Sequence, residues 1–528
     1  MFGHAKRQTQ PFWLVWVTTF AFACLTVAVN AFEADQFLIF FLFPIAAAAL
    51  ALAGFGRTVS KSEINSGWWL PMLPLGLLMI WYMFICVFGQ FSISAILFHF
   101  QYDLDSNGVA GEIAYQIFSS SLPFGLIFVC WTKLSRGGTV LQRLGKILFV
   151  PLMLLNPFTL AISTYVASAY ASQSLSLLQY YVDPRLAHLD EGIRKNLVHI
   201  YLESTERTLW DERLFDDVAA PLKRLEANGF SATGLDQAEL TGWTLAGVVS
   251  SGCGVPLFNL GALNGNKFEH TTHFMPSAFC LGDLLSRDGY DLVFIKGAQL
   301  SFAGTDRYLH GHGFKNAFGY DELAIAGKSP PNAWGLDDED VFGFAFREIE
   351  RLSKSARPFD LTLTTLGGHS PSGYVSRSCK TRPEIMKHES DTMQAFACTN
   401  RLTEEFVQRL SNAGLLENTV VVIQSDHLAM RNEISRKLQS EKRHNTFIVI
   451  AEGLAGKTSS VGATMIDAYP TILEALGYTL PDHRAGLGVS LLSDRKPLME
   501  AFGLNELNKA IVSDTALRDR LWNLKARS

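Results

Sequence analysis

Five long apolar stretches in the first third of this 528-residue chain constrain its fold more than any other feature. They cover residues 12–32, 37–55, 68–91, 113–131 and 147–167. Each has roughly the 20 residues that a helix needs to cross the hydrocarbon core of a bilayer. We therefore predict a five-helix membrane anchor over residues 1–168, a juxtamembrane linker helix over residues 169–192 and one soluble domain over residues 193–528.

Charged residues between the apolar stretches indicate how the anchor is oriented. Basic residues gather on one side of the predicted membrane, which is then the cytoplasmic side: Lys6, Arg7, Arg57, Lys61, Lys133, Arg136, Arg143 and Lys146. The other connections contain no Lys or Arg and carry acidic residues: Glu33, Asp35, Asp103, Asp105 and Glu112. The first stretch is interpreted as an uncleaved anchor, because no small-residue cleavage site follows it. The amino terminus is expected in the cytoplasm and the soluble domain outside it.

Net charge and cysteine content limit the partners and the compartment. The formal charge is -5 and no basic run is present, so nucleic acid is not expected as a partner. Three of the seven cysteines lie in apolar stretches, where they are expected to pack as small apolar residues: Cys24, Cys86 and Cys130. The other four permit two disulfides in an oxidising compartment without fixing their pairing. We favour Cys253 with Cys280 and Cys379 with Cys398, since each pair closes a short loop.

Short apolar runs alternate with helical periods in the soluble domain. The predicted strands cover residues 197–202, 292–296, 360–366, 419–424 and 446–450. The predicted helices cover residues 218–227, 278–286 and 400–411, and a further helix opens near Asp467. Pro470 in the first turn of that helix and Gly477 past its end fit the usual start and stop signals. This alternation predicts an α/β fold with a mainly parallel sheet that is covered on both faces.

Two of the predicted strands stop at residues that commonly bind metal ions. One ends at Glu203, and the other is followed by Asp426 and His427. Open α/β folds place their ligands at the carboxyl edge of the sheet, so these three side chains are expected to form one metal site. An Asp-His pair alone is weak evidence, because it often marks only a turn. Glu203 strengthens the prediction, since a carboxylate at the end of a buried strand is costly without a cation or another partner.

Thr244 is placed to begin a helix of small residues between these ligands. A hydroxyl there would meet unpaired backbone N–H groups and the positive end of the helix dipole, which favour an anionic substrate. A neighbouring divalent cation would make it a nucleophile. The alternative is that Thr244 or Thr241 only caps the helix. Trp243 is expected either to wall the substrate pocket or to anchor the helix.

Several motifs follow one another in order along the soluble domain. They are YLESTER at 201–207, WTLAG at 243–247, SGCGVP at 251–256, CLGD at 280–283, FAGTDRYL at 302–309 with HGF at 312–314, and SDHLAM at 425–430. Together they resemble the periplasmic phosphoglycerol transferases that decorate glucans. More distantly, the plan is similar to lipoteichoic acid synthases and lipid A phosphoethanolamine transferases, all of the alkaline phosphatase and sulfatase superfamily. The resemblance covers most of residues 195 to 480.

The resemblance assigns a role to each matching residue. Glu203, Asp426 and His427 fall on metal ligands of the family, and Thr244 falls on its nucleophile, which also touches the metal. His369, in the motif GGHS at 367–370, falls on a histidine that the family uses to hold the substrate phosphate. In the expected reaction it would assist proton movement or bind phosphate.

The headgroup pocket is matched less completely. Asp306 and Arg307 fall in the segment that lines this pocket in the family. A Trp and an Arg that lipoteichoic acid synthases carry there are replaced in the nearest register by Ala303 and Thr305. His310 and His312 lie in the following loop and are interpreted as structural.

The resemblance implies a reaction, a metal and a location. Phosphoglycerol would move from phosphatidylglycerol to a periplasmic glucan through a covalent intermediate on Thr244, with release of diacylglycerol. One divalent cation is expected. The resemblance points to Mn²⁺, and Mg²⁺ or Zn²⁺ also suits an oxygen-rich ligand set with one imidazole. The expected location is the bacterial inner membrane, with several spans and a periplasmic catalytic domain; no oligomeric state is predicted.

Two other functions remain open at this point. A phosphoethanolamine or other headgroup transferase, or a hydrolase, would keep the site and act on lipid A or another glycan. A membrane-anchored binding or sensor protein would need no catalysis, but the intact set of ligand residues argues against it.

Overall fold

The computed structural model of the chain describes ten stretches of sequence, and these form two compact units divided between residues 167 and 168. The described residues are 69–88, 110–135, 147, 149–170, 175–189, 192, 194–258, 268, 271–323 and 331–524. The predicted spans 12–32 and 37–55 lie outside these ranges. Each unit is described by itself.

The first unit contains helices from the apolar part of the chain. α3 (Met72–Phe88) packs against α5 (Ala110–Ser135) through Tyr82 and Phe124, whose ring centroids lie 5.6 Å apart. The helix α7 (Pro157–Tyr170) follows. Within the described ranges, no helix combines the length and the hydropathy that a membrane span requires. The five-helix anchor predicted from the sequence is therefore not confirmed.

The juxtamembrane linker helix predicted over residues 169–192 is wrong for residues 175–189. This segment forms two short 3₁₀ turns, η2 (Leu177–Tyr180) and η3 (Pro184–Leu186), and the strand β1 (His188–Leu189). Proline disfavours helical geometry in the residue before it, and Asp183 is accordingly extended before Pro184. The segment instead finds partners in the second unit, where β1 pairs with β12 (Tyr478–Thr479).

The second unit is built on an eight-stranded sheet with the order β10-β3-β9-β8-β2-β7-β5-β6. β9 runs antiparallel to its two neighbours, and all other neighbouring strands are parallel. The mainly parallel sheet predicted from the sequence is confirmed. The strands are β2 (Asn196–Leu202), β3 (Phe230–Ala232), β5 (Asp291–Lys296), β6 (Asn316–Phe318), β7 (Phe359–Thr364), β8 (Thr419–Ser425), β9 (Phe447–Ile450) and β10 (Lys457–Ser459).

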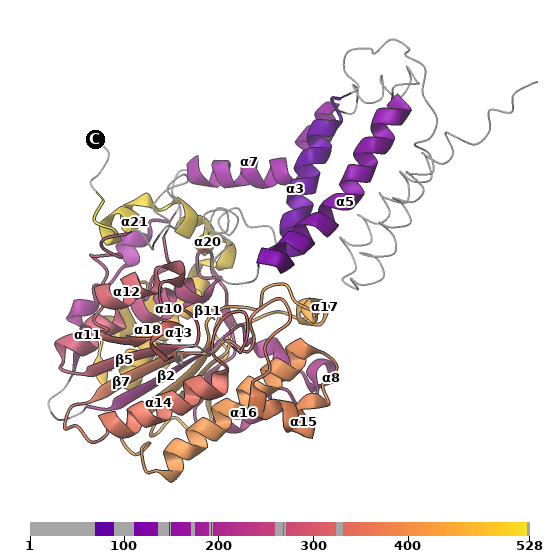
Figure 1. Cartoon of the computed structure of the whole chain (residues 1–528). Coiled ribbons are helices and arrows are strands. Elements are labelled where there is room, and N and C mark those ends of the chain that lie inside the picture. Colours follow the sequence, from indigo (N-terminus) through magenta and orange to yellow (C-terminus); the bar gives the residue numbers. More distant parts are fainter. Residues whose placement is uncertain are drawn as a thin grey trace, which may run out of the picture. The chain divides into compact units, whose positions relative to one another are not determined.

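Helices cover both faces of this sheet (Figure 1). On one face, the core is shared with α10 (Thr244–Cys253), α11 (Leu281–Arg287), α12 (Thr305–Gly311), α18 (Ala468–Ala475), α19 (Leu498–Phe502), α20 (Leu504–Ser513) and α21 (Thr515–Leu521). On the other face, it is shared with α9 (Ala220–Glu226), α14 (Asp338–Leu352) and α16 (Asp391–Asn412). Because both faces are buried, β8 and β9 are largely apolar along their length. β7 instead alternates apolar residues with the buried polar residues Asp360, Thr362 and Thr364.

Two disulfides join elements around the sheet. Cys253 at the end of α10 is bonded to Cys280 at the start of α11, and Cys379 is bonded to Cys398 in α16. Both pairings agree with the prediction from loop length.

Candidate active site

The parallel register of β2 and β8 brings the predicted metal ligands together. Leu202 pairs with Ser425, so the next residues, Glu203 and Asp426, leave the sheet side by side. Nε2 of His427 lies 3.3 Å from Oε1 of Glu203 and 3.5 Å from Oδ2 of Asp426. All three side chains are buried, and one ligand atom from each lies within 4.8 Å of the others. The predicted convergence of Glu203, Asp426 and His427 is therefore observed.

Burial and mutual charge make this cluster electrostatically unusual. Burial raises the pKa of Asp426 to about 7, and the charge of Glu203 adds to the rise. Burial also opposes ionisation of Glu203, but the charges of His427 and His369 outweigh it and hold the pKa of Glu203 below its usual range. Burial disfavours protonation of His427, yet the charges of Asp426 and Glu203 raise its pKa to about 10. Two buried carboxylates facing one another favour a bound positive charge.

The orientation of His427 also fits a metal ligand. Its Nδ1 lies 2.8 Å from the carbonyl oxygen of Leu428, which can only accept a hydrogen bond. Nδ1 therefore carries a proton, and Nε2 faces the two carboxylates. Metal-binding histidines commonly donate their other ring N–H to a carbonyl in this way. With two carboxylate oxygens and one imidazole nitrogen, these residues fit a divalent cation.

Thr244 lies beside the cluster at the amino end of α10. Trp243 is extended and precedes the first turn, and the Thr244 hydroxyl donates to Oε2 of Glu203 at 3.3 Å. Gly247, one turn further on, packs so closely that an added Cβ would lie 1.8 Å from the carbonyl oxygen of Asp426. Only glycine permits α10 to approach the ligand strand this closely, so the fold itself brings the Thr244 hydroxyl to the ligands.

A buried hydroxyl holds α10 against the two ligand strands. Ser251 Oγ lies 2.8 Å from the Tyr201 hydroxyl, 2.9 Å from Nε2 of Gln424 and 2.9 Å from the carbonyl oxygen of Gly247. Tyr201 and Gln424 each lie two residues before a predicted ligand, on β2 and β8. These bonds fix the helix that carries Thr244 relative to Glu203 and Asp426.

His369 lies in the loop that follows β7, and this loop crosses close to Glu203. A Cβ on Gly368 would lie 2.3 Å from the carbonyl oxygen of Glu203. Nδ1 of His369 lies 2.8 Å from the carbonyl oxygen of Ser370, so Nδ1 carries a proton and Nε2 is left for other partners. The charge of His369 lowers the pKa of Glu203, as expected for an imidazole beside the cluster.

Asp306 and Arg307 lie near the start of α12. The Arg307 side chain is 52% exposed, and its Nε lies 3.6 Å from Oδ2 of Asp306. Asp306 is half-buried and contributes negative charge near Lys296. Their proposed role in the headgroup pocket stays a prediction.

Lys296 is a further candidate that was not found from the sequence. It is the last residue of β5, only 6% exposed, and its Nζ lies 3.4 Å from Oγ1 of Thr305. Burial lowers its pKa to about 8, against the opposing charges of Glu203, Asp306 and Asp426. A buried cation at the same edge of the sheet as Glu203 and Asp426 is suited to an anionic group. The available signal was a lysine that ends an apolar strand.

Trp243 and two nearby histidines have clear structural partners. Trp243 stacks on Phe268 with centroids 6.4 Å apart, and Phe268 stacks on Trp522 at 5.6 Å. These contacts support the anchoring role for Trp243. His310 is exposed and bonded to the backbone of Asp306, and His312 is buried against Asp283, which agrees with structural roles for both.

The fold and the site together define a class of protein. A mainly parallel sheet with two carboxylates, an imidazole and a helix-terminal hydroxyl at its carboxyl edge is equipped for metal-assisted chemistry on an anionic substrate. The sulfatase family model matches residues 195–478, just over half of the chain. The chain belongs to the sulfatase family.

Comparisons with individual proteins give more detail. Phosphoglycerol transferase I of Citrobacter koseri is 36% identical over 332 residues, which cover 62% of this chain and 42% of that protein. The chain thus spans less than half the length of this curated relative. A solved protein of the alkaline phosphatase superfamily from Vibrio parahaemolyticus is 21% identical with a TM-score of 0.46, covering 63% of this chain and 79% of that one. Lipoteichoic acid synthase LtaP from Listeria monocytogenes is 16% identical with a TM-score of 0.44, covering 63% and 82%.

Proposed function

We propose that this protein transfers phosphoglycerol from phosphatidylglycerol to a periplasmic glucan in a metal-dependent reaction. The observation that carries the proposal is the 3.3 Å contact between the Thr244 hydroxyl and Glu203 at the edge of the ligand cluster. The likeness to phosphoglycerol transferase I supports the choice of transferred group. The buried Lys296 supports an anionic substrate at this edge of the sheet.

Glu203, Asp426, His427 and Thr244 would hold the divalent cation. When bound, the cation would stabilise charge on the phosphoryl oxygens and lower the pKa of the Thr244 hydroxyl. We propose Mn²⁺, and Mg²⁺ or Zn²⁺ remains compatible with this set of donors. The metal type follows from the family resemblance and the donor chemistry.

The proposed transfer has two steps. The Thr244 oxygen attacks the phosphorus of phosphatidylglycerol, the bond from phosphorus to the diacylglycerol oxygen breaks, and the proton of Thr244 ends on diacylglycerol. A sugar hydroxyl then attacks the phosphorus held on Thr244, and the Thr244 oxygen leaves and regains a proton. In this proposal, Nε2 of His369 would hold a phosphoryl oxygen or move a proton, and Lys296 would offset negative charge.

The proposed location is the bacterial inner membrane, with the amino terminus in the cytoplasm and the second unit in the periplasm. The five apolar stretches and the charges between them support this orientation. The two disulfides of the second unit suit an oxidising compartment. A tethered enzyme would also meet its lipid donor at high effective concentration.

The test uses the full-length protein, lipid labelled in the glycerol headgroup, and a β-glucan acceptor. Label is expected to reach the saccharide, and a denatured sample taken early is expected to carry phosphoglycerol on a peptide that contains Thr244. Label that appears only as free phosphoglycerol would identify a hydrolase, and absence of any turnover would favour a binding protein. Either result would refute the transferase proposal.

Thr244→Ala is expected to abolish turnover while bound metal largely persists, because the variant loses the nucleophile and keeps Glu203, Asp426 and His427. Thr241→Ala is the matched control. The Thr241 hydroxyl is buried and donates to the carbonyl oxygen of Ala238 at 2.7 Å, away from the ligands. Full turnover by Thr244→Ala would exclude this residue as the nucleophile.

A further inference from the structure

We propose that Trp334 and Asp338 form a bracket that positions His369, with Asp338 holding the backbone of the histidine loop and Trp334 holding the imidazole ring. The inference rests on the proposed function, since it concerns a side chain of the same site. Trp334 lies in the segment that leads into α14, and Asp338 is the first residue of that helix; both come more than 30 residues before His369 in the sequence.

The Asp338 carboxylate accepts hydrogen bonds from the backbone just before His369. Asp338 is the first residue of α14 and is 1% exposed. Its Oδ1 accepts from the backbone N–H of Leu366 at 2.7 Å, and its Oδ2 accepts from that of Gly367 at 3.0 Å. Oδ2 also accepts from the Thr399 hydroxyl of α16 at 2.6 Å. One buried carboxylate therefore ties the histidine loop to two helices.

The same loop is confined on its other side by a predicted metal ligand. A Cβ on Gly367 would lie 2.2 Å from Oγ1 of Thr399 and 2.6 Å from Oδ2 of Asp338. A Cβ on Gly368 would lie 2.3 Å from the carbonyl oxygen of Glu203. The two glycines pass between the bracket and the ligand strand, where a side chain on either residue would clash.

Trp334 confines the imidazole of His369. The two ring centroids lie 3.9 Å apart with an angle of 36° between the planes, and Phe302 contacts Trp334 edge-on at 5.6 Å. Asn332 Oδ1 accepts from the backbone N–H groups of Trp334 and Gly335 at 2.9 Å and 3.0 Å. With Nδ1 bonded to Ser370 and one ring face covered, His369 has Nε2 as its remaining reactive atom.

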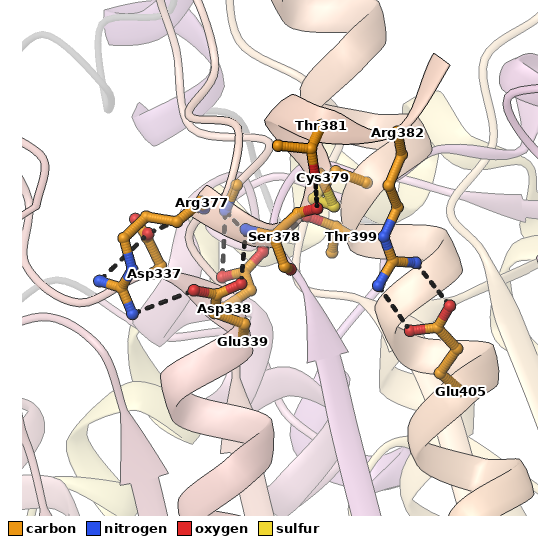
Figure 2. The surroundings of a disulfide bond; sticks show 12 residues. Asp337, Asp338, Glu339, Arg377, Ser378, Cys379, Thr381, Arg382, Thr399 and Glu405 are labelled. Atoms are coloured by element: carbon orange, nitrogen blue, oxygen red, sulfur yellow. Dashed lines mark hydrogen bonds and ion pairs between the residues drawn. A yellow bond between two sulfur atoms is a disulfide. The ribbon is translucent and has the colours of Figure 1, made fainter. Parts of the chain in front are cut away.

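The neighbouring acidic residue Glu339 offers a comparison. Figure 2 shows Asp338 and Glu339 side by side at the start of α14, close to Arg377 and Ser378. Glu339 accepts from the backbone N–H of Ser378 at 2.8 Å and pairs with Arg377 at 3.0 Å. It thus holds the segment beside the Cys379–Cys398 disulfide rather than the histidine loop. Burial raises the pKa of Asp338 to about 6.

The test compares variants in two backgrounds, wild type and His369→Ala, with bis(p-nitrophenyl) phosphate and with phosphatidylglycerol as substrates. Trp334→Ala is expected to lower kcat by about 10-fold to 100-fold with KM within about twofold, the effect of a misplaced reacting group. In the His369→Ala background, the same substitution is expected to change nothing, because residues that act through one another are not additive. Trp334→Phe, which keeps an aromatic face, should recover most of the loss.

Asp338→Asn is expected to behave like Trp334→Ala, with a smaller loss, because one of its two acceptor oxygens becomes a donor. Glu339→Gln is the matched control and should retain wild-type kcat. Equal losses in both backgrounds, or equal losses for Asp338→Asn and Glu339→Gln, would show a general structural role and overturn the proposal. If wild type cleaves the chromogenic diester but does not transfer phosphoglycerol, the proposed function fails while the bracket remains testable.

Discussion

Two groups of side chains in the second unit have the residue types of a metal site. They differ in whether their potential ligand atoms are already bonded by local structure. Among the described residues, Glu203, Asp426 and His427 form one group, and Cys280, Asp283 and His312 form the other. In each group the potential ligand atoms lie within 4.8 Å of one another. Residue type and proximity alone do not separate them.

In the second group, local structure already uses the potential ligands. The Cys280 sulfur is bonded to Cys253. Oδ2 of Asp283 accepts from the backbone N–H of Cys280 at 2.9 Å, where it caps α11, and lies 2.7 Å from Nδ1 of His312. The disulfide makes the Cys280 sulfur unavailable to a metal ion, and the Asp283 carboxylate accepts a hydrogen bond at the start of α11. This group stabilises the junction of α10 and α11.

In the first group, the fold orients the side chains and leaves ligand atoms facing one another. Oδ1 of Asp426 accepts from the backbone N–H groups of Ser204 and His427 at 2.9 Å and 2.8 Å, which leaves Oδ2 toward His427. Oε1 of Glu203 accepts from the Ser204 hydroxyl at 2.8 Å. The comparison shows how a candidate metal site can be recognised. Local hydrogen bonds orient its side chains, and ligand atoms still face a common point.

Glu203→Gln should have the largest effect, because it removes one of two buried carboxylates that face the cation position. Bound metal, measured by elemental analysis of the purified protein, is expected to fall sharply, and the proposed transferase activity to fall by at least about 100-fold. Asp283→Asn is the control in the other group and should keep full metal content. Equal metal loss in both variants would show that the two groups do not differ as metal sites.

Removal of the Cys253–Cys280 disulfide should affect stability and leave metal binding intact. The double variant Cys253→Ala, Cys280→Ala removes a crosslink between two residues that are 27 positions apart. Disulfides of this kind typically contribute about 2–4 kcal/mol to the free energy of unfolding. Chemical denaturation should therefore show a lower midpoint, with metal content per folded protein unchanged. Loss of the metal without loss of stability would show that this group binds the metal and does not stabilise the fold.

Asp360 provides the most specific test, as a buried carboxylate outside both groups. Its Oδ1 accepts from Thr362 at 2.9 Å, and burial raises its pKa to about 7. A raised pKa means that the folded state binds the proton more tightly than the unfolded state between the unfolded pKa near 4 and the folded pKa near 7. Asp360 therefore costs stability progressively as pH rises through this window.

Asp360→Asn removes this ionisation. Its free energy of unfolding relative to wild type should rise between pH 4 and 7 by at most about 1.4 kcal/mol per pH unit, and then level off. Denaturation of both proteins at pH 5, 6 and 8 measures the difference. A difference that does not change with pH would show that Asp360 ionises normally in the folded protein.

Much of the second unit could be predicted from the sequence. Alternating apolar runs and helical periods indicated a parallel sheet, and parallel strands share a carboxyl edge, so Glu203 and Asp426 had to lie near one another if β2 and β8 were neighbours. The disulfide pairing followed from short loop lengths. These features depend on local spacing, which the sequence states directly.

Other features were decided only by the tertiary structure. The segment 175–189 was predicted as part of a linker helix, but it pairs with residues 478–486 instead, 289 to 304 positions away. Lys296, Trp334 and Asp338 carry no motif, and they join the site because β5 ends at the same edge and because α14 packs beside α16. Local spacing determines which strands and helices form. The contacts that confine Thr244 and His369 arise between segments that are distant in the sequence, and no single stretch of sequence encodes how these segments pack.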